Sequence, residues 1–390
     1  MNTIRPLILT LLFSSCICAE SKPIRFATFN TALNRNRAGE LIDDLKTGEN
    51  DQARKIAEII QRVRPSVLLI NEFDYDERHE AAALFDNNYL QVGQRGQKPI
   101  HYKHRFLAAV NTGVDSGKDL NGDGKTGGPA DAFGFGKFPG QYGMVVFSEL
   151  PIKTEALRTF HKFLWADMPS ADLPTDPKTK RAFYNDDVLD VFRLSSKSHW
   201  DLPIVVGDEV VHFLVCHPTP PVFDGPEDRN GRRNRDEIRF WADYIDPLAS
   251  KFIYDDQGKC GGLSPGAKFV VAGDLNADPV DGESSGDTAQ LLTKNLKINT
   301  AKTPSSLGGV EQSTLQGKIN ARHKGNPAHD TCDFNDFSVG NLRVDYVLPS
   351  DNLTIVDAGV FWPKKNATGF DLVDASDHRL VWIDVRLASE

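Results

Sequence analysis

Short apolar runs that each end in polar residues are the feature that most constrains the fold of this chain. The runs are too short for buried helices and are typical of strands inside a sheet. Since the end of a strand places polar side chains at the rim of a sheet, the residues there can converge. The expected strands span residues 24–30, 67–71, 144–148, 210–216, 268–273, 343–348 and 380–387.

Seven polar residues stand at or next to the ends of these expected strands. A single Asn or Asp in such a place is usually a turn residue. Together, however, carboxylates, amides and imidazoles are the groups suited to a hard metal ion and a phosphate. We therefore predict that they meet at one site. The residues are Asn30, Glu72, His217, Asp274, Asn276, Asp377 and His378.

Helical periodicity between the runs makes the chain a mixture of strands and helices. Residues 51–64 place apolar side chains on one helical face, and Pro65 then stops the helix. Further helices are expected over residues 77–90 and 234–248. Residues 160–202 show no period and are expected to be irregular. The pattern predicts an α/β protein.

The first residues are typical of a secretory signal peptide. Arg5 supplies a positive charge, a short apolar run follows at residues 7–13, and Ala19 suits the last position before cleavage. That run is too short to span a bilayer, and no later stretch looks transmembrane. We expect a signal peptide at residues 1–19, a single catalytic domain with long loop insertions at residues 20–390, and a secreted protein, periplasmic or extracellular.

The charge balance bears on the partners of the chain. Its formal net charge is −9. Affinity for the phosphate backbone comes from Lys and Arg, so this balance argues against broad, non-specific binding of nucleic acid. A nuclease with a locally basic cleft is still compatible with it. No obligate protein partner is evident from the sequence.

Seven segments together resemble the motifs of the endonuclease/exonuclease/phosphatase superfamily, which includes pancreatic-type deoxyribonucleases and abasic-site endonucleases. Gly-Asp-x-Asn and Ser-Asp-His are specific when both occur in this order, and the resemblance runs from about residue 24 to residue 385. It implies a four-layer α/β/β/α sandwich, with two packed mixed β-sheets flanked by helices. The segments are FATFN (26–30), LLINEFD (68–74), GMVVFSELPI (143–152), VCHP (215–218), VAGDLNADP (271–279), RVDYVLPS (343–350) and SDHRLVWIDV (376–385).

The resemblance implies metal ligands. Glu72 corresponds to the main ligand of a divalent cation, Asn30 to a residue that helps to hold the metal and phosphate, and Asp377 to a further ligand. The expected cofactor is Mg²⁺ or Mn²⁺, since both prefer carboxylate and water oxygens.

The resemblance also implies catalytic roles. Asp274 corresponds to the carboxylate that orients or deprotonates the attacking water, and Asn276 to an amide that contacts the phosphate. His378 corresponds to the imidazole that stabilises the pentacovalent phosphorane, and Asp345 to the carboxylate that orients it. His217 stands where nuclease members have a second histidine that assists the leaving group.

The expected function is hydrolysis of a phosphomonoester or phosphodiester by direct attack of water. The sequence contains neither a Gly-x-Ser-x-Gly elbow nor a P-loop, so nothing in it suggests a covalent intermediate. An extracellular nuclease that scavenges phosphate or nucleotides is an alternative, and an inactive secreted binding protein is another. The complete set of carboxylates and histidines argues against the binding protein. The substrate stays open between a small organic phosphate, a phosphodiester and nucleic acid.

A Gly-rich segment at residues 119–131 has two interpretations. Asp119, Asn121 and Asp123 follow the spacing of a Ca²⁺ loop, but Ala130 stands where an EF-hand has its glutamate. A structural calcium site and a simple Asp/Gly-rich turn both stay open.

Two other features also stay open. An arginine-rich segment that includes Arg229 and Arg232 either binds substrate phosphate or forms a solvated helix face. Cys260 and Cys332 either form a disulfide, as an oxidising compartment allows, or are two free thiols.

Overall fold

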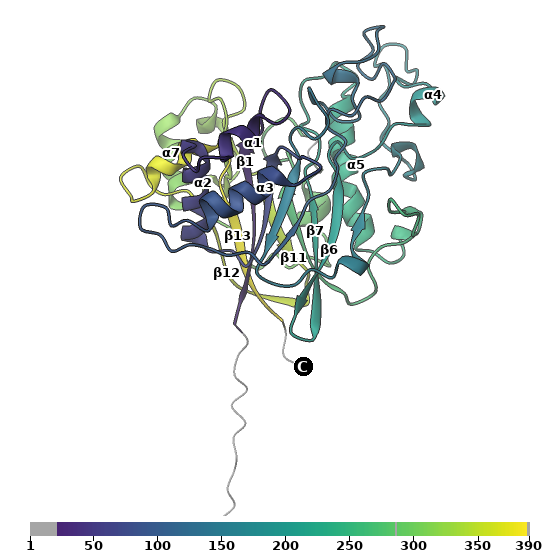
Figure 1. The fold of residues 1–390 in the computed structure, drawn as a ribbon. Helices are drawn as coiled ribbons and strands as arrows, with labels where there is room; N and C mark the ends of the chain where they lie inside the picture. Colours follow the sequence, from purple (N-terminus) through teal and green to yellow (C-terminus); the bar gives the residue numbers. More distant parts are fainter. Residues whose placement is uncertain (1–21, 285–286, 388–390) are drawn as a thin grey trace, which may run out of the picture.

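Two β-sheets form the centre of the molecule (Figure 1). The computed structural model describes residues 22–284 and 287–387. The expected signal peptide lies outside the described residues, so secretion stays a prediction. In spatial order, the first sheet consists of β12 (Leu353–Val360), β13 (Val381–Leu387), β1 (Ile24–Leu33), β2 (Val67–Phe73), β4 (Met144–Ser148) and β3 (His104–Phe106). The second consists of β11 (Asp345–Pro349), β8 (Lys268–Asp274), β7 (Glu209–Cys216), β6 (His199–Val206) and β5 (Arg158–Thr159).

The two sheets pack face to face because alternate side chains of a strand point to opposite sides. In β1, Phe26 points between the sheets, whereas Ala27 points toward helices. In β7, Phe213 points between the sheets and Leu214 points away. The rings of Phe26 and Phe213 have centroids 5.4 Å apart. This alternation gives each sheet one face for its partner sheet and one for helices.

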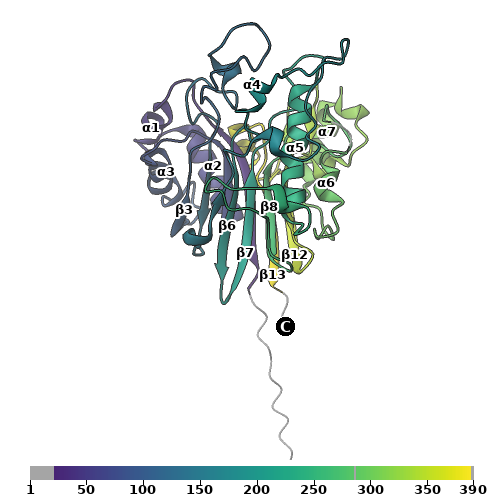
Figure 2. The same ribbon diagram turned by 90° about the vertical axis from the view of Figure 1, so that its right-hand side faces the viewer.

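Helices cover both outer faces and complete four layers (Figure 2). The helices on the six-stranded sheet are α1 (Glu40–Leu45), α2 (Asp51–Val63) and α3 (Glu80–Phe85). Those on the five-stranded sheet are α5 (Arg229–Tyr244) and α6 (Gln290–Thr293). The pairs β1–β2 and β7–β8 are parallel and the other pairs of the two large sheets are antiparallel. The expected α/β fold, with two packed mixed sheets flanked by helices, is confirmed.

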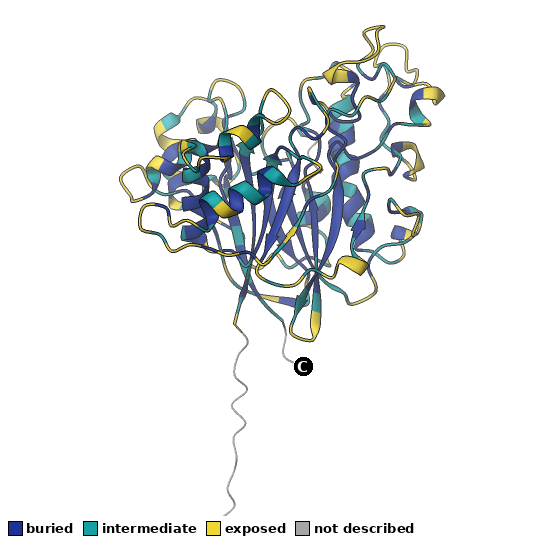
Figure 3. Cartoon of the chain, viewed as in Figure 1, coloured by how far each residue is buried: buried dark blue, intermediate teal, exposed yellow. Residues whose placement is uncertain are grey.

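Smaller elements lie in the connections, where exposed residues gather (Figure 3). They include α4 (Asp186–Leu189), α7 (Leu307–Gln316), and the ribbon of β9 (Cys332–Asp333) with β10 (Asn341–Leu342). A π-helical turn spans Asp86–Leu90. Single 3₁₀ helices span Pro129–Asp131, Thr154–Ala156, Trp165–Asp167, Ser250–Phe252, Asn320–Arg322, Pro327–His329 and Phe370–Ala375. No helix within residues 22–284 and 287–387 is long and apolar enough to cross a bilayer.

Several elements differ from their expected bounds, α3, α5 and β6 among them. The helix expected from residue 77 starts at Glu80, because the Asp76 carboxylate accepts backbone N–H groups of the first turn. Helix α5 starts at Arg229, five residues before its expected start at residue 234. Strand β6 begins inside the stretch that was expected to be irregular. Asp201 and Pro203 have low β-propensity, so the sequence does not indicate this strand. Pairing with β7 along the whole length of β6 compensates for that low propensity.

Candidate active site

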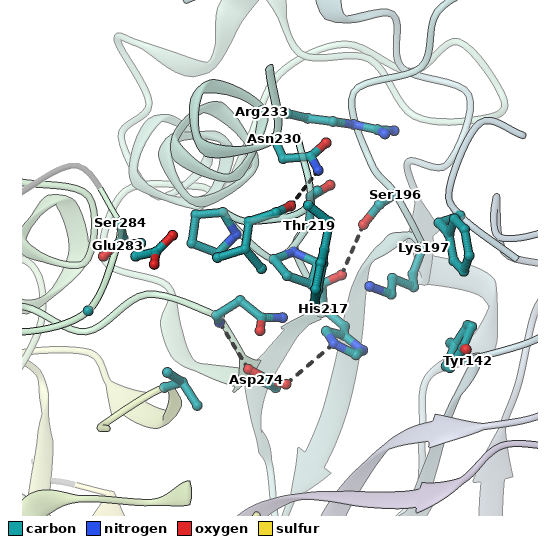
Figure 4. A pocket seen from close by; sticks show the side chains of 18 of the residues that line it. Tyr142, Ser196, Lys197, His217, Thr219, Asn230, Arg233, Asp274, Glu283 and Ser284 are labelled. Atoms are coloured by element: carbon teal, nitrogen blue, oxygen red, sulfur yellow. Dashed lines mark hydrogen bonds and ion pairs between the residues drawn. The ribbon is translucent and has the colours of Figure 1, made fainter. Parts of the chain in front are cut away.

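The ends of strands β2, β7 and β8 open onto one pocket of about 840 Å³. Six of the seven predicted residues line this pocket, and the seventh, Asn30, lies buried beneath it. Figure 4 shows His217 and Asp274 facing each other there. The six are Glu72, His217, Asp274, Asn276, Asp377 and His378. The structure therefore brings the predicted residues together, while their chemical roles stay predictions.

Glu72 is held at the pocket by two side-chain amides. The Asn34 amide donates to Oε2 at 2.8 Å, and the Asn30 amide donates to Oε1 at 3.1 Å. Glu72 has a φ of +56°, which is uncommon for a residue with a side chain. Such backbone strain gathers at functional sites, where the surrounding structure enforces it.

Asp274 is the centre of the hydrogen-bonded cluster. The Asn30 amide donates to Oδ2 at 3.0 Å, and the Asn276 backbone N–H donates to Oδ1 at 2.9 Å. The same Oδ2 lies 3.4 Å from His217 Nε2 and 3.6 Å from His378 Nε2. Burial opposes ionisation, but the two imidazoles and Asn30 outweigh it and hold the pKa of Asp274 below its usual range.

His378 is paired with the carboxylate behind it. Its Nδ1 lies 2.8 Å from Asp345 Oδ2, and both side chains are buried. Asp345 lies opposite Asp274 in the β11–β8 pair, so one strand pair carries both carboxylates. Burial disfavours the cation, but Asp345 and Asp274 outweigh it and raise the pKa of His378 to about 10. The imidazole is therefore charged near neutral pH.

His217 has the opposite electrostatic character. It follows β7 and is buried, and burial together with the nearby Lys197 ammonium lowers its pKa. The site thus combines a neutral imidazole and a charged one on either side of Asp274. A proton acceptor and a proton donor are available in the same pocket.

Sequence reasoning missed Lys197. Its side chain is 7% exposed and lines the pocket, and within the described residues it makes no hydrogen bond or ion pair. Figure 4 shows its nitrogen directed into the pocket beside His217. Burial lowers the pKa of Lys197, whereas Glu237, Glu72 and Asp274 act to raise it. Lys197 stands in a short Ser-rich segment without periodicity, so no pattern marks it.

Buried Glu237 of α5 positions that segment. Its two carboxylate oxygens accept the backbone N–H groups of Ser196 and Thr219, both at 2.6 Å. One side chain thus fixes the residue before Lys197 and the second residue after His217. Glu237 lies in the part of α5 that the sequence predicts, but its contacts with two backbone groups far away in the chain leave no sequence pattern.

Hard oxygen donors at the pocket fit a divalent cation. Glu72 is half-buried, Asp377 is exposed and Asp274 is buried, and all three line the pocket. In this structure Asn30 presents its amide nitrogen to both carboxylates, so metal binding through its oxygen requires a rotated amide. Within the described residues, Asp274, Asp345 and His378 also have possible ligand atoms within 4.8 Å of one another. The charged, Asp345-paired imidazole is a poor metal ligand, which favours Glu72 as the principal donor.

The Gly-rich segment forms a hydrogen-bonded turn in the structure. The Asp119 carboxylate accepts the backbone N–H groups of Gly122, Asp123 and Gly124. The side chains of Asn121 and Asp123 likewise accept N–H groups two residues on. These oxygens serve as caps of a turn, and calcium binding stays untested.

Both arginines that were predicted to bind phosphate form ion pairs, and one of them also lines the pocket. Arg229 lines the pocket and pairs with Glu227. Arg232 pairs with Asp172 and is not among the described residues that line the pocket. The expected phosphate-binding role of Arg232 is therefore not supported by its position.

The two cysteines are not linked. Cys260 is exposed and Cys332 is buried, and both are free thiols. The disulfide alternative is wrong for this structure. Cys332 lies in the short β9 strand and pairs with His378 across an isolated β-bridge, which leaves its side chain inside the protein.

Comparisons with known proteins agree with this architecture. A family model described as "Endonuclease/Exonuclease/phosphatase family" matches residues 27–378. An endonuclease/exonuclease/phosphatase from Beutenbergia cavernae is 17% identical, with a TM-score of 0.50, and the match covers 95% of this chain and 72% of that one. The human Nocturnin catalytic domain with bound sulfate is 13% identical, with a TM-score of 0.46, over 95% and 97% of the two chains.

Sphingomyelinase C from Streptomyces griseocarneus is 15% identical, with a TM-score of 0.46, over 93% of this chain and 99% of that one. No curated protein matches. At 17% identity, the similarity to the Beutenbergia cavernae structure concerns the fold alone.

Proposed function

Because this chain belongs to the endonuclease/exonuclease/phosphatase family, we propose that it is a divalent-metal-dependent phosphoesterase that hydrolyses a phosphomonoester or phosphodiester by direct attack of water. The observation that carries the proposal is the position of Asp274. Its Oδ2 lies within 3.6 Å of a ring nitrogen of each of two histidines, one charged and one neutral. A merely structural carboxylate does not need two such partners.

Asp274 orients the attacking water. Its pKa is held low, so the carboxylate is a weak proton acceptor and acts mainly by accepting a hydrogen bond. His217 is neutral because of burial and the Lys197 charge, and it is suited to accept the proton that the water loses. The two groups thereby align and activate one water molecule. This proposed role differs from the leaving-group role that the resemblance implies for His217.

His378 faces the charge that grows on the phosphate oxygens. Its cation is held in place by Asp345, which fixes the ring before the reaction begins. A preorganised charge of this kind stabilises a transition state because it needs no reorganisation. The protonated ring can also donate to the leaving oxygen. Lys197, without an ion-pair partner among the described residues, adds a second positive charge for the phosphate.

Glu72, with Asn30 and Asp377, would hold the divalent cation. When bound, the cation supplies a Lewis acid that neutralises charge on the phosphate oxygens. Replacing an anionic ligand by a neutral one weakens such a site. The carboxylate of Glu72 is therefore the group whose loss should reveal metal dependence most clearly.

Hydrolysis of bis-p-nitrophenyl phosphate and of p-nitrophenyl phosphate tests the proposal. We expect turnover of at least one ester with Mg²⁺ or Mn²⁺ and none in EDTA. Glu72→Gln should lower kcat/KM about 100-fold at a fixed metal concentration, and added metal should partly restore it. Glu149→Gln, the same change at an exposed residue beyond the far end of β4, should have no effect. Turnover that resists EDTA would show that the mechanism is wrong.

A further inference from the structure

The pocket changes character away from the catalytic residues. Its floor carries the carboxylates and histidines, but one wall is formed by apolar side chains. They come from three connections: residues 120–135, residues 184–192, and residues 219–223, which directly follow His217. The side chains of this apolar wall are Leu120, Ala132, Phe135, Tyr184, Phe192, Pro220, Pro221, Val222 and Phe223.

Two phenylalanines of the apolar wall are exposed. Phe223 is 88% exposed and Phe135 is 59% exposed, although both line the pocket. Exposing a large apolar side chain costs free energy, and such residues beside a cavity are typical of a binding surface. Phe223 also has a φ of +67°, which is a true outlier for a bulky residue. Backbone strain and an exposed aromatic ring thus occur together at this lining residue.

The charges near the apolar wall are already paired. Arg229 pairs with Glu227, and Arg232 pairs with Asp172. The guanidinium of Arg233 is buried and donates to backbone carbonyls of Leu194, Phe133 and Arg193. Each of the three arginines thus already has hydrogen-bond or ion-pair partners, whereas the side chain of Lys197 makes no such contact within the described residues. The site therefore suits one phosphate with an apolar substituent, and it does not suit a chain of phosphates.

We infer that this pocket selects phosphate esters with a flat apolar ring, which lies against the apolar wall while the phosphate lies on the floor. The inference rests on the proposed function, since it assigns the phosphate to the catalytic residues. Phenylalanine and proline side chains give flat surfaces on which a ring can stack. The volume of about 840 Å³ is that of a site for a small molecule. A nucleic acid polymer and a polyphosphorylated sugar are disfavoured because, among the described residues, the arginines at the wall are already paired.

Binding of phosphonates tests this inference without any turnover. The carbon–phosphorus bond is not hydrolysed here, so calorimetry with methyl-, hexyl- and phenylphosphonate in the presence of Mg²⁺ reports binding alone. We expect phenylphosphonate to bind about tenfold more tightly than methylphosphonate, because the ring is removed from water, and more tightly than the longer hexyl compound. Phe223→Ala and Phe135→Ala should reduce the phenyl preference severalfold. Leu248→Ala, at an exposed residue that does not line the pocket, should preserve it.

The outcomes separate the two proposals. Equal affinity for phenyl- and methylphosphonate would overturn the ring site, even if the enzyme hydrolyses bis-p-nitrophenyl phosphate. Equal affinity for hexyl- and phenylphosphonate would show a general apolar surface and would also overturn it. A phenyl preference that Phe223→Ala abolishes would support the ring site even in a protein with no hydrolytic activity, in which case the proposed function alone would fail.

Discussion

At the scale of single residues, the pairing of His378 with Asp345 has the clearest consequence. His378→Ala should lower kcat about 10²–10³-fold, because it removes one preorganised positive group from the site. Asp345→Asn keeps the shape of the partner but removes its charge, so the loss should be smaller. Unfolding by urea should show that both variants are folded. Because the two residues act as one unit, the double variant should be barely worse than His378→Ala alone.

The pH profile gives a second measurement on the same pair. The active form has His378 protonated, so the rate should fall as pH rises through its pKa of about 10. Asp345 helps to raise that pKa, and Asp345→Asn should therefore move the alkaline limb of the profile to lower pH. If the alkaline limb of the Asp345→Asn profile does not move, Asp345 is not the partner of His378. The same conclusion follows if the two losses in kcat multiply independently in the double variant.

At the scale of elements, the close approach of β7 and β8 sets the position of Asp274. Gly273 has a φ of +152°, and a Cβ there would lie 2.0 Å from the Cys216 carbonyl oxygen. Gly273→Ala must push the two strands apart just before Asp274. We expect a loss of about 2–4 kcal/mol in the free energy of unfolding, together with reduced turnover.

Gly207→Ala is the matched control for this prediction. Gly207 also has a positive φ, of +61°, but a Cβ there meets nothing within 4 Å. It should cost only about 1 kcal/mol and leave kcat unchanged. Urea unfolding that shows the same destabilisation for both substitutions would contradict the prediction, because backbone strain alone, and not the strand contact, would then explain the loss at residue 273.

Elements with strong apolar runs could be predicted and others could not. Strands β1, β2, β7 and β8 are mostly buried, so apolar residues predominate in them and their polar ends stand out. Strand β6 carries Asp201 and Pro203, and it becomes a strand because β7 pairs with it. Lys197 lies just before β6. The sequence there shows no apolar strand pattern, so this residue of the pocket could not be predicted.

At the scale of the whole molecule, the catalytic floor and the apolar wall have different origins. The floor lies at the ends of strands, where register and alternation fix each side chain. The wall comes from connections far apart in the chain, between residues 120 and 223, and three of its side chains, Leu120, Tyr184 and Phe192, pack in one apolar cluster with residues of helix α5. A sequence pattern can therefore indicate the reaction, whereas the shape that selects a substrate appears only in three dimensions.

The central claim is that water attacks phosphorus directly, and the stereochemical course of hydrolysis tests it most directly. A phosphorothioate diester of one configuration would be hydrolysed in oxygen-18 water, and the configuration of the labelled thiophosphate product would be determined. One displacement by water, positioned by Asp274, predicts inversion at phosphorus. Retention requires two displacements and a covalent enzyme intermediate, and that result would contradict the mechanism.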